Sequence, residues 1–292
     1  RMPSAAQHAT PPGAPVVSIV MASYRRLSLL KSAVGSALAQ DYSSYEVLVV
    51  DDGSDEDTRA WLRSAQAGDA RLRVIFQEHL GVAEARARGV AEARGQLVCI
   101  LDSDDTLAPP ALKRLTEEFN AHPESVLVYT GIAECRPNGS VKVQRYPVFP
   151  TARRMLRAIL LRPRVPFKHS GTTFQRRVAL ELGSYDRNLP CKVDIDFYLR
   201  FLHAGYLPRL VSEPLVDFRM HKDSVSRNRL LGLRVWFHLI DRYGPPNPVY
   251  RLGLKVLRAV AEGSKWLYVE WTSGCQRFPG SQNRKETGNE KK

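Results

Sequence analysis

Acidic residues follow an apolar run at the point where that run ends. Residues 102–105 (DSDD) come directly after QLVCIL at 96–101. Asp102 and Asp104, one residue apart at a strand end, can point into a common site. Carboxylate oxygens bind Mg²⁺ or Mn²⁺ and leave coordination positions open for phosphate oxygens. Solvated turns also contain such pairs, so the position after an apolar strand is what favours a metal and phosphate site.

A second acidic run, DDGS at 51–54, follows the apolar residues 46–50. Asp51 or Asp52 can accept hydrogen bonds from a ribose hydroxyl or a base N–H, as acidic residues do in dinucleotide-binding folds. The alternative is a type I turn whose polar side chains cap the next helix. Both interpretations hold together if Asp55 caps the helix while an earlier carboxylate faces the ligand.

Gly81 opens a helical pattern that extends from Val82 to Ala93 and contains Arg86. The N-terminus of a helix, with a glycine before it and an arginine nearby, is a natural site for an anion. The alternative is a basic helix face that is merely solvated. There is no GxGxxG after the first apolar run and no GxxxxGK[ST], so the chain has neither a dinucleotide fingerprint nor a P-loop.

Apolar runs alternate with helical patterns through the first hundred residues. Runs that are apolar throughout and separated by helices predict a parallel sheet covered on both faces. Ligands of such sheets bind at the carboxyl ends of the strands. We therefore expect the residues just after each strand to carry the chemistry. The expected strands are 16–22, 46–50, 72–76 and 96–101, and the expected helices are 25–40, 57–66 and 82–93.

The pattern changes after a helix that starts near Pro109 and ends before Pro123. A turn at 137–140 predicts a β-hairpin between the runs on either side. The expected elements are strands at 126–133, 141–144 and 215–220, helices at 151–161 and 194–203, an irregular basic loop at 163–174, and two amphipathic helical segments from Leu230 onward, split by GPP at 244–246.

Composition sets broad limits on the class of protein. The 292 residues can form one large α/β domain or two small ones, and 43 Lys and Arg against 30 Asp and Glu give a net charge of +13. A basic excess suits an anionic partner: nucleic acid, an acidic membrane face or a phosphorylated substrate. The four cysteines show no metal-ligand spacing, which indicates a reducing compartment, and no stretch approaches the roughly 20 apolar residues of a membrane span. We expect a cytoplasmic protein.

Four segments in this order resemble the family 2 glycosyltransferases, which have the GT-A fold: PVVSIVMASYRR, EVLVVDDGSDEDT, GVAEARARG and the DSDD after an apolar strand. The resemblance covers about Pro15 to His221. It implies an inverting enzyme that uses a nucleotide-diphosphate sugar together with Mn²⁺ or Mg²⁺. Among the nucleotides, the family favours UDP. The family places Asp102 and Asp104 on the metal, with Asp104 closest to it. The donor-binding residues implied are Ser23, Tyr24, Arg25, Asp52, Gly81, Arg86, Asp102, Ser103, Asp104 and Arg219.

The second half of the chain supports the resemblance. HSGTTFQRRVALELGSYDRNL, which contains Gly171, resembles the acceptor-side segment of the family. KVDIDFYLR resembles its E-D-x-D-x-x-x-R helix start, which implies that Asp194 is the general base and that Asp196 lies on the acceptor side. RMH at 219–221 resembles the family's R-x-H, whose His221 can approach the metal. The chain departs from the family at Val193, where Glu is common, and at Ala87, where Asn is frequent.

The resemblance divides the chain into functional regions. We expect a disordered leader at 1–14, a nucleotide-sugar half at 15–125, an acceptor half at 126–228, amphipathic helices at 229–272 and a disordered tail at 273–292. The acceptor group implied is a hydroxyl of a glycan, of a lipid-linked acceptor or of another acceptor molecule. The C-terminal helices either cover the catalytic domain or make a peripheral contact with the anionic inner face of a membrane, and both interpretations remain open.

Three other functions compete with glycosyl transfer. A sugar-1-phosphate nucleotidyltransferase would carry a Gly, Arg and Lys-rich loop after the first strand, where this chain has ASYRR at 22–26. A basic nucleic-acid-binding or scaffold protein would show salt-dependent binding to RNA or DNA, and would leave the aspartates at the strand ends without a role. A processive membrane synthase is disfavoured because the sequence has no QxxRW and no spanning segment.

Overall fold

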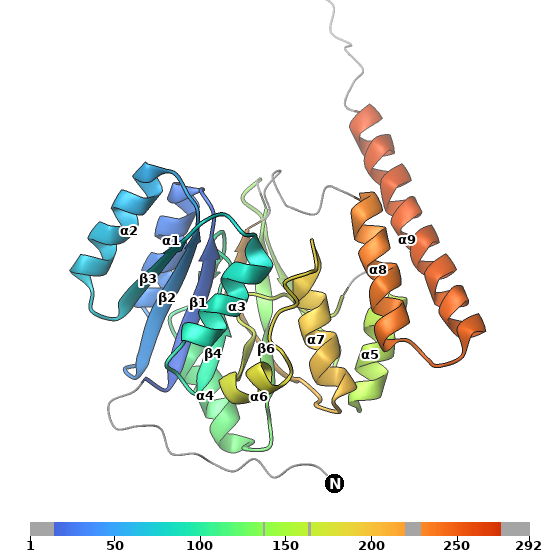
Figure 1. The fold of residues 1–292 in the computed structure, drawn as a ribbon, viewed down its shortest axis with the longest axis horizontal. Helices are drawn as coiled ribbons and strands as arrows, with labels where there is room; N and C mark the ends of the chain where they lie inside the picture. The colour runs from blue at the N-terminus through green and yellow to red at the C-terminus, as the bar shows by residue number, and fades with distance from the viewer. Residues whose placement is uncertain (1–14, 137, 163–164, 220–228, 276–292) are drawn as a thin grey trace, which may run out of the picture.

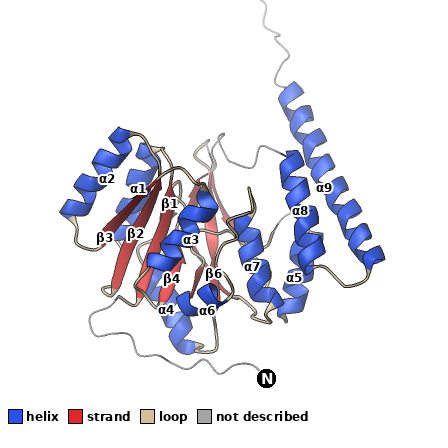
Figure 2. Ribbon diagram, in the orientation of Figure 1, coloured by secondary structure: helices blue, strands red, loops and turns tan. Residues whose placement is uncertain are grey.

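The computed structural model describes residues 15–136, 138–162, 165–219 and 229–275, the last of these with side chains from 230 to 263. The expected leader at 1–14 and residues 276–292 of the expected tail lie outside this part of the chain. In the described residues the strands form one nine-stranded sheet, ordered β3-β2-β1-β4-β8-β6-β9-β5 with β7 paired to β6. Helices lie on both sides of the sheet, as Figure 2 shows. The expected mostly parallel α/β fold is confirmed.

The N-terminal half alternates strand and helix as the apolar pattern predicts. The β1 strand pairs in parallel with β2 and with β4, and β2 pairs in parallel with β3. Both β1 and β2 are buried nearly throughout, which explains their continuous apolar sequence. The elements are β1 Val17–Ser23, α1 Leu27–Leu38, β2 Tyr45–Asp52, α2 Glu56–Gly68, β3 Leu72–Gln77, α3 Val82–Glu92 and β4 Leu97–Ile100.

The second half of the sheet mixes directions. The short β8 strand pairs antiparallel with both β4 and β6, and so joins the two halves into one sheet. The elements are β5 Thr106–Leu107, α4 Ala111–Ala121, β6 Leu127–Cys135, β7 Val141–Gln144, α5 Ala152–Leu161, β8 Thr173–Gln175, α6 Arg176–Glu181, α7 Val193–His203, β9 Arg209–Arg219, α8 Arg229–Tyr243 and α9 Pro248–Cys275. Figure 1 shows α8 and α9 side by side at the edge of the molecule away from α2.

The core consists of two clusters, one on each side of the sheet. In β1, Val20 belongs to one cluster while Ile19 and Met21 belong to the other, because successive strand residues point to opposite faces. Gly89 lets α3 lie close against the sheet, since a Cβ there would stand 2.4 Å from Val20 Cγ1. The packing of α3 on β1 therefore depends on a residue without a side chain.

The expected strand at 215–220 is wrong at its start, because β9 begins at Arg209. Pro214 interrupts the apolar run and hides the first half of the strand. The register of β9 on β6 shifts between Thr130 and Ile132, and a Cβ on Gly131 would lie 2.7 Å from Ser212 O. The glycine and the bulge accommodate the proline in the sheet. The expected loop at 163–174 also proves to contain the start of β8, at Thr173.

The two C-terminal helices differ in how they use their apolar residues. Val235, Trp236, Leu239 and Ile240 of α8 are buried in the core, so this helix covers the catalytic domain as one of the two interpretations predicts. Large apolar side chains of α9 remain exposed. In the part of the chain that the structure describes, no helix combines the length and the apolar character needed to cross a membrane.

Candidate active site

The carboxyl ends of β1, β2 and β4 bring the predicted residues to one edge of the sheet. Ser23 ends β1 and lies in register with Asp51 of β2, while Asp102 follows β4 on the other side of β1. Arg26 Nη1 donates to Asp104 Oδ2 at 2.8 Å, which joins the loop after β1 to the DSDD loop. Residues that are 78 positions apart in the chain thus share one site.

Asp52 fixes the loop that leads into α3. Its carboxylate accepts hydrogen bonds from Gln77 Nε2 at 2.7 Å, Leu80 N at 2.9 Å and Gly81 N at 2.9 Å. Gly81 adopts φ of +95°, a conformation that side chains disfavour, and this turns its amide toward the carboxylate. Asp52 is therefore buried and bonded to the protein on both oxygens, which makes it a support for the α3 N-terminus.

Tyr24 lies in a flat aromatic pair at the edge of the site. The rings of Tyr24 and His79 stack with centroids 3.9 Å apart and planes 19° from parallel. Arg25 stands beside them, with its guanidinium carbon 5.0 Å from the Tyr24 centroid and its amide donating to Ser54 Oγ at 2.7 Å. His79 could not be predicted from the sequence, because its partner Tyr24 lies far away in the chain. Stacked, partly exposed rings are suited to contact a nucleobase.

Asp51 and Ser23 carry polar atoms without a hydrogen-bond partner among the described residues. Both Asp51 Oδ1 and Ser23 Oγ are buried, and the second Asp51 oxygen accepts from Ser54 N at 3.3 Å. Asp55 caps α2 by accepting from Thr58 N at 3.0 Å, which confirms the capping interpretation for that residue. Of the two carboxylates predicted at the end of β2, Asp51 is thus the one with a buried oxygen that has no partner among the described residues.

Each carboxylate of the DxD pair faces a guanidinium. Arg86 Nη2 of α3 pairs with Asp102 Oδ1, and Arg26 pairs with Asp104. Burial alone would raise the pKa of Asp102, but the charge of Arg86 outweighs it and holds that pKa below its ordinary value. The two side chains are 31% and 21% exposed, so both carboxylates remain open to solvent and to a ligand. Ser103 lies between them, half-buried.

Asp105, which the sequence did not single out, ties the DSDD loop to the other half of the sheet. Its carboxylate accepts from Ser170 Oγ at 2.5 Å and from Arg219 N at 3.0 Å. Ser170 Oγ in turn accepts from Asp102 N at 3.2 Å. Burial, followed by the nearby charge of Asp102, raises the pKa of Asp105 to about 8. Through this carboxyl group the backbone of the predicted Arg219 reaches the site.

The residues predicted for the acceptor side lie in the segment before β8 and at the start of α7. Gly171 N donates to Ile100 O at 2.8 Å, which places this glycine against the end of β4. His169 Nε2 and Tyr185 Oη lie 2.7 Å apart in the interior. Asp194, in the first turn of α7, is half-buried and interacts electrostatically with Arg86, His169 and Tyr185. The charge of Asp194 is therefore close enough to be felt by Arg86, the arginine that pairs with Asp102.

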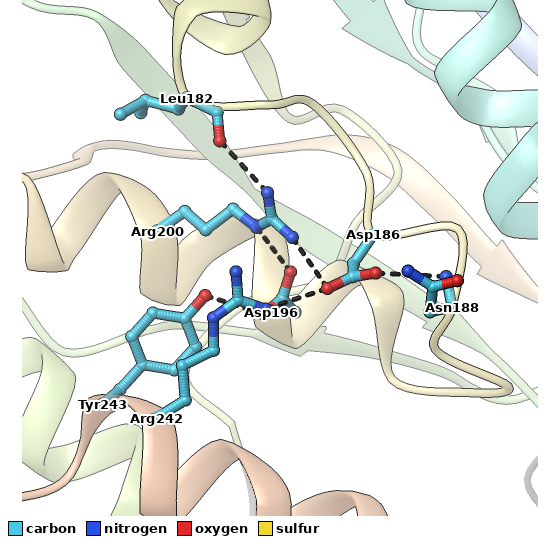
Figure 3. Close-up of polar contacts among 7 residues, drawn as sticks. All are labelled: Leu182, Asp186, Asn188, Asp196, Arg200, Arg242 and Tyr243. Atoms are coloured by element: carbon cyan, nitrogen blue, oxygen red, sulfur yellow. Dashed lines mark hydrogen bonds and ion pairs between the residues drawn. The ribbon is translucent and has the colours of Figure 1, made fainter.

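Asp196 points to the opposite side of α7 from Asp194. In an α-helix, residues two positions apart are separated by about 200° around the helix axis, so Asp194 and Asp196 cannot both face the same site. Asp196 is fully buried and accepts from Arg200 Nε at 2.6 Å and from Tyr243 Oη at 2.7 Å, as Figure 3 shows. Arg242 of α8 joins the same network through Asp186 at 2.9 Å. The structure thus gives Asp196 contacts that hold α8 on α7.

The predicted metal ligands are two carboxylates and one histidine. His221 lies outside the described residues, and within those residues no group of three or more His, Cys, Asp or Glu side chains could hold a metal ion. Asp102 and Asp104 remain. One or two carboxylates together with substrate phosphates are the usual ligands of Mg²⁺ in nucleotide-dependent enzymes. The donor set present therefore fits Mg²⁺ or Mn²⁺ when the substrate supplies further oxygens.

The model of the family described as "Glycosyl transferase family 2" matches residues 18–183, more than half of the chain. The chain belongs to glycosyl transferase family 2. The match begins in β1 and ends just after α6, so it includes the DSDD loop and both arginines that pair with it. The resemblance inferred from the four ordered segments is confirmed at the level of the family.

A full-length relative is much longer than this chain. Hyaluronan synthase from Pasteurella multocida is 26% identical over 226 residues, which is 77% of this chain and 22% of that protein. The chain thus spans about a fifth of the length of this relative.

Solved structures of other glycosyltransferases share the fold. TarS from S. aureus, in complex with UDP-GlcNAc, superimposes with a TM-score of 0.63 and 15% identity over 85% of this chain and 72% of that one. The mannosyltransferase PcManGT from Pyrobaculum calidifontis, in complex with GDP-Man and Mn²⁺, gives a TM-score of 0.60 and 17% identity over 90% and 80%. The GT-A fold expected for a family 2 protein is confirmed.

Proposed function

We propose that this family 2 glycosyltransferase transfers a sugar from a nucleotide-diphosphate sugar to a hydroxyl of a glycan or lipid-linked acceptor, with inversion at the anomeric carbon. The observation that carries the proposal is the convergence of Asp102 and Asp104 with Arg86 and Arg26 at the end of β4. Two anionic and two cationic groups at one strand end can bind a metal and a diphosphate together. A polysaccharide or cell-envelope glycan is the acceptor class that a relative named hyaluronan synthase suggests.

The donor end of the site is formed by the residues after β1, β2 and β4. The Tyr24 and His79 rings lie where a nucleobase can stack, and we propose a UDP-sugar as the donor because a neighbour of the same fold was solved with UDP-GlcNAc. Arg86 and Arg26 can donate to the diphosphate oxygens as negative charge grows on the leaving group. A Mn²⁺ or Mg²⁺ ion held by Asp102 and Asp104 would supply Lewis-acid stabilisation of the same charge.

The acceptor end of the site contains the general base. We assign this role to Asp194, which lies in the first turn of α7 and interacts with Arg86 across the site. Asp194 accepts the proton of the acceptor hydroxyl as that oxygen attacks the anomeric carbon. The acceptor oxygen bonds to the anomeric carbon from the face opposite the diphosphate, and the bond from that carbon to the diphosphate breaks in the same step. A single displacement of this kind gives a product with the inverted configuration. Asp196 cannot share this role because it bonds to Arg200 and Tyr243.

Substitution of Asp104 tests the proposal. Asp104→Asn keeps the shape of the side chain but removes the charge, so we expect the variant to fold and to lose Mn²⁺-dependent release of UDP from a UDP-sugar. Calorimetry should show weaker binding of Mn²⁺ with UDP present. Asp57→Asn, an exposed change on α2, is the matched control. Full activity of Asp104→Asn, with circular dichroism unchanged, would remove the DxD pair from the proposed reaction.

A further inference from the structure

The α9 helix turns its apolar face to solvent and its basic residues toward the protein, which is the reverse of the usual arrangement. Its exposed positions from 249 to 263 carry no charged side chain in the part of α9 whose side chains are described. A surface helix of a globular protein normally turns its apolar stripe to the core and its charges to water. The large apolar side chains left exposed are Val249, Tyr250, Leu252, Val256, Leu257 and Val260, each more than half exposed.

In the part of α9 whose side chains are described, the basic residues face the protein and are bonded there. Arg251 Nε donates to Pro245 O at 2.7 Å, and Lys255 Nζ pairs with Asp241 Oδ2 at 2.7 Å. Arg258 is 1% exposed, and its Nη2 donates to two carbonyls at the end of α5 at 2.7 and 2.9 Å. Its guanidinium carbon lies 3.6 Å from the centre of the Trp236 ring. These contacts fix which way α9 faces, so its apolar side cannot turn inward.

The element that α9 contacts at Arg258 is strongly basic. On α5 and at its end, Arg153, Arg154, Arg157 and Arg162 are all exposed. The sequence from 136 to 168 contains nine Lys and Arg and no Asp or Glu. The α9 helix therefore lies beside an element whose exposed charges are all positive. Anionic lipids attract such residues, and exposed apolar side chains can enter the boundary between headgroups and acyl chains.

A second copy of the chain is a poorer occupant of this face. Each copy carries a net charge of +13, and pairing through α9 would bring two basic α5 helices close to the shared interface. We propose that the exposed face of α9, together with the exposed arginines of the adjoining α5, docks on a bilayer that contains anionic phospholipid. The proposal is independent of the donor and of the base, because vesicle binding is measured without substrate.

Vesicle sedimentation with the full chain tests the docking. We expect the wild-type protein to sediment with phosphatidylcholine vesicles that contain phosphatidylglycerol and to remain in solution with phosphatidylcholine alone. Val256→Glu combined with Val260→Glu places charge on the docking face, and should lower the partition coefficient by at least about tenfold. The matched control is Ala60→Glu with Ala67→Glu, which adds the same charge to exposed positions of α2. Because this control leaves the docking face unchanged, it should bind the vesicles like the wild type, with only the small loss that its lower net charge causes.

A second set of variants tests the basic flank. Arg153→Gln, Arg154→Gln and Arg157→Gln together should weaken binding to the anionic vesicles, and added salt should weaken binding of the wild type in the same way. Failure of the wild type to bind either kind of vesicle would overturn the proposal. So would a dimer in lipid-free buffer, detected by light scattering, that the Val256 and Val260 changes convert to a monomer, because a second copy would then cover the face. Circular dichroism confirms folding in each case.

Discussion

Two arginines from distant segments hold the carboxylates that we assign to the metal. Arg86 comes from α3 and Arg26 from the loop after β1. A diphosphate offers each guanidinium another anionic partner, so donor binding can release the carboxylates to a cation. The donor and the metal should therefore each raise the affinity for the other. The diphosphate occupies the two guanidinium groups, and the cation then neutralises the carboxylates that those groups release.

Arg26→Ala should therefore raise the affinity for Mn²⁺ in the absence of nucleotide and lower the affinity for the donor. We expect changes of several-fold, the size of coupling that one partly exposed ion pair provides. Mn²⁺ binding can be followed by electron paramagnetic resonance of the free ion. Arg63→Ala, which removes an exposed pair with Glu56 on α2, is the control. Weaker Mn²⁺ binding by the Arg26 variant would show that the arginine assists the metal.

Asp194→Asn separates the base from the donor-binding residues. We expect kcat to fall by about 10²–10⁴, the usual effect of losing a general base, while the donor Kd changes only a few-fold. Steady-state assays and calorimetry with the same preparation give the two quantities. A collapse of donor binding together with kcat would identify Asp194 as a ligand contact, and the base would then lie elsewhere.

His169 gives the site a dependence on pH that can be measured through stability. Burial and the charge of Arg86 lower the pKa of His169 from 6.5 to about 4. In the unfolded chain the histidine takes up its proton first as pH falls. Its contribution to stability is therefore complete above pH 6.5 and is lost as pH falls toward 4, by at most about 3 kcal/mol.

His169→Gln can retain a hydrogen bond to Tyr185 but cannot take up this proton. We expect the free energy of unfolding of the wild type to fall more steeply than that of the variant between pH 6.5 and 4.5. Urea unfolding at several pH values measures both slopes. Equal slopes for the two proteins would mean that the histidine is not kept neutral by its surroundings.

At the scale of elements, the contact between α7 and α8 depends on one buried carboxylate. Asp196→Ala would leave Arg200, whose side chain is 13% exposed, without its nearest anion. Breaking a buried pair in this way costs about 3–5 kcal/mol of stability. Urea unfolding should show this loss, whereas Glu56→Ala, in an exposed pair, should cost less than about 1 kcal/mol. A small loss for Asp196→Ala would mean that the apolar residues of α8 and the pair of Arg242 with Asp186 are enough to hold it.

The sequence predicts these elements well where periodicity is local, and less well where contacts are distant. Strands β1 to β4 and helix α3 follow from apolar runs and helical spacing within about two residues of their ends. The start of β9 does not, because Pro214 is accommodated only by Gly131 on another strand. Helical periodicity separates Asp194 from Asp196 but does not say which of them faces the site.

Site residues missed by the sequence share the same cause. His79 is placed in the site by stacking on Tyr24, and Asp105 by its hydrogen bonds with Ser170 and Arg219. All three partners are distant in the chain. The DSDD motif shows that carboxylates gather after β4, while only the fold shows that the last of them faces inward. The charge pattern of α9 also misleads, because its basic residues are the ones that face the protein.

For the whole molecule, donor binding should appear as added stability. A ligand that binds only the folded state, at 100 times its Kd, raises the free energy of unfolding by about 2.7 kcal/mol. A thermal-shift panel of nucleotide sugars with Mn²⁺ should therefore single out the donor. We expect a UDP-sugar to give the largest shift and EDTA to reduce it. A shift of equal size for free sugars would contradict recognition through the diphosphate.

The burial of Arg258 bears on how a docked enzyme would reach its acceptor. Its guanidinium bonds to the end of α5 and stacks on Trp236 of α8, so three helices are joined at one residue. Pulling α9 away would take that guanidinium with it, leave the two α5 carbonyls without their donor and uncover the Trp236 ring, which is energetically expensive. The helix therefore cannot act as a flexible tether. A bilayer bound to α9 would hold the active site at a fixed height and tilt above the lipid surface. The enzyme would then select acceptor hydroxyls by their distance from that surface.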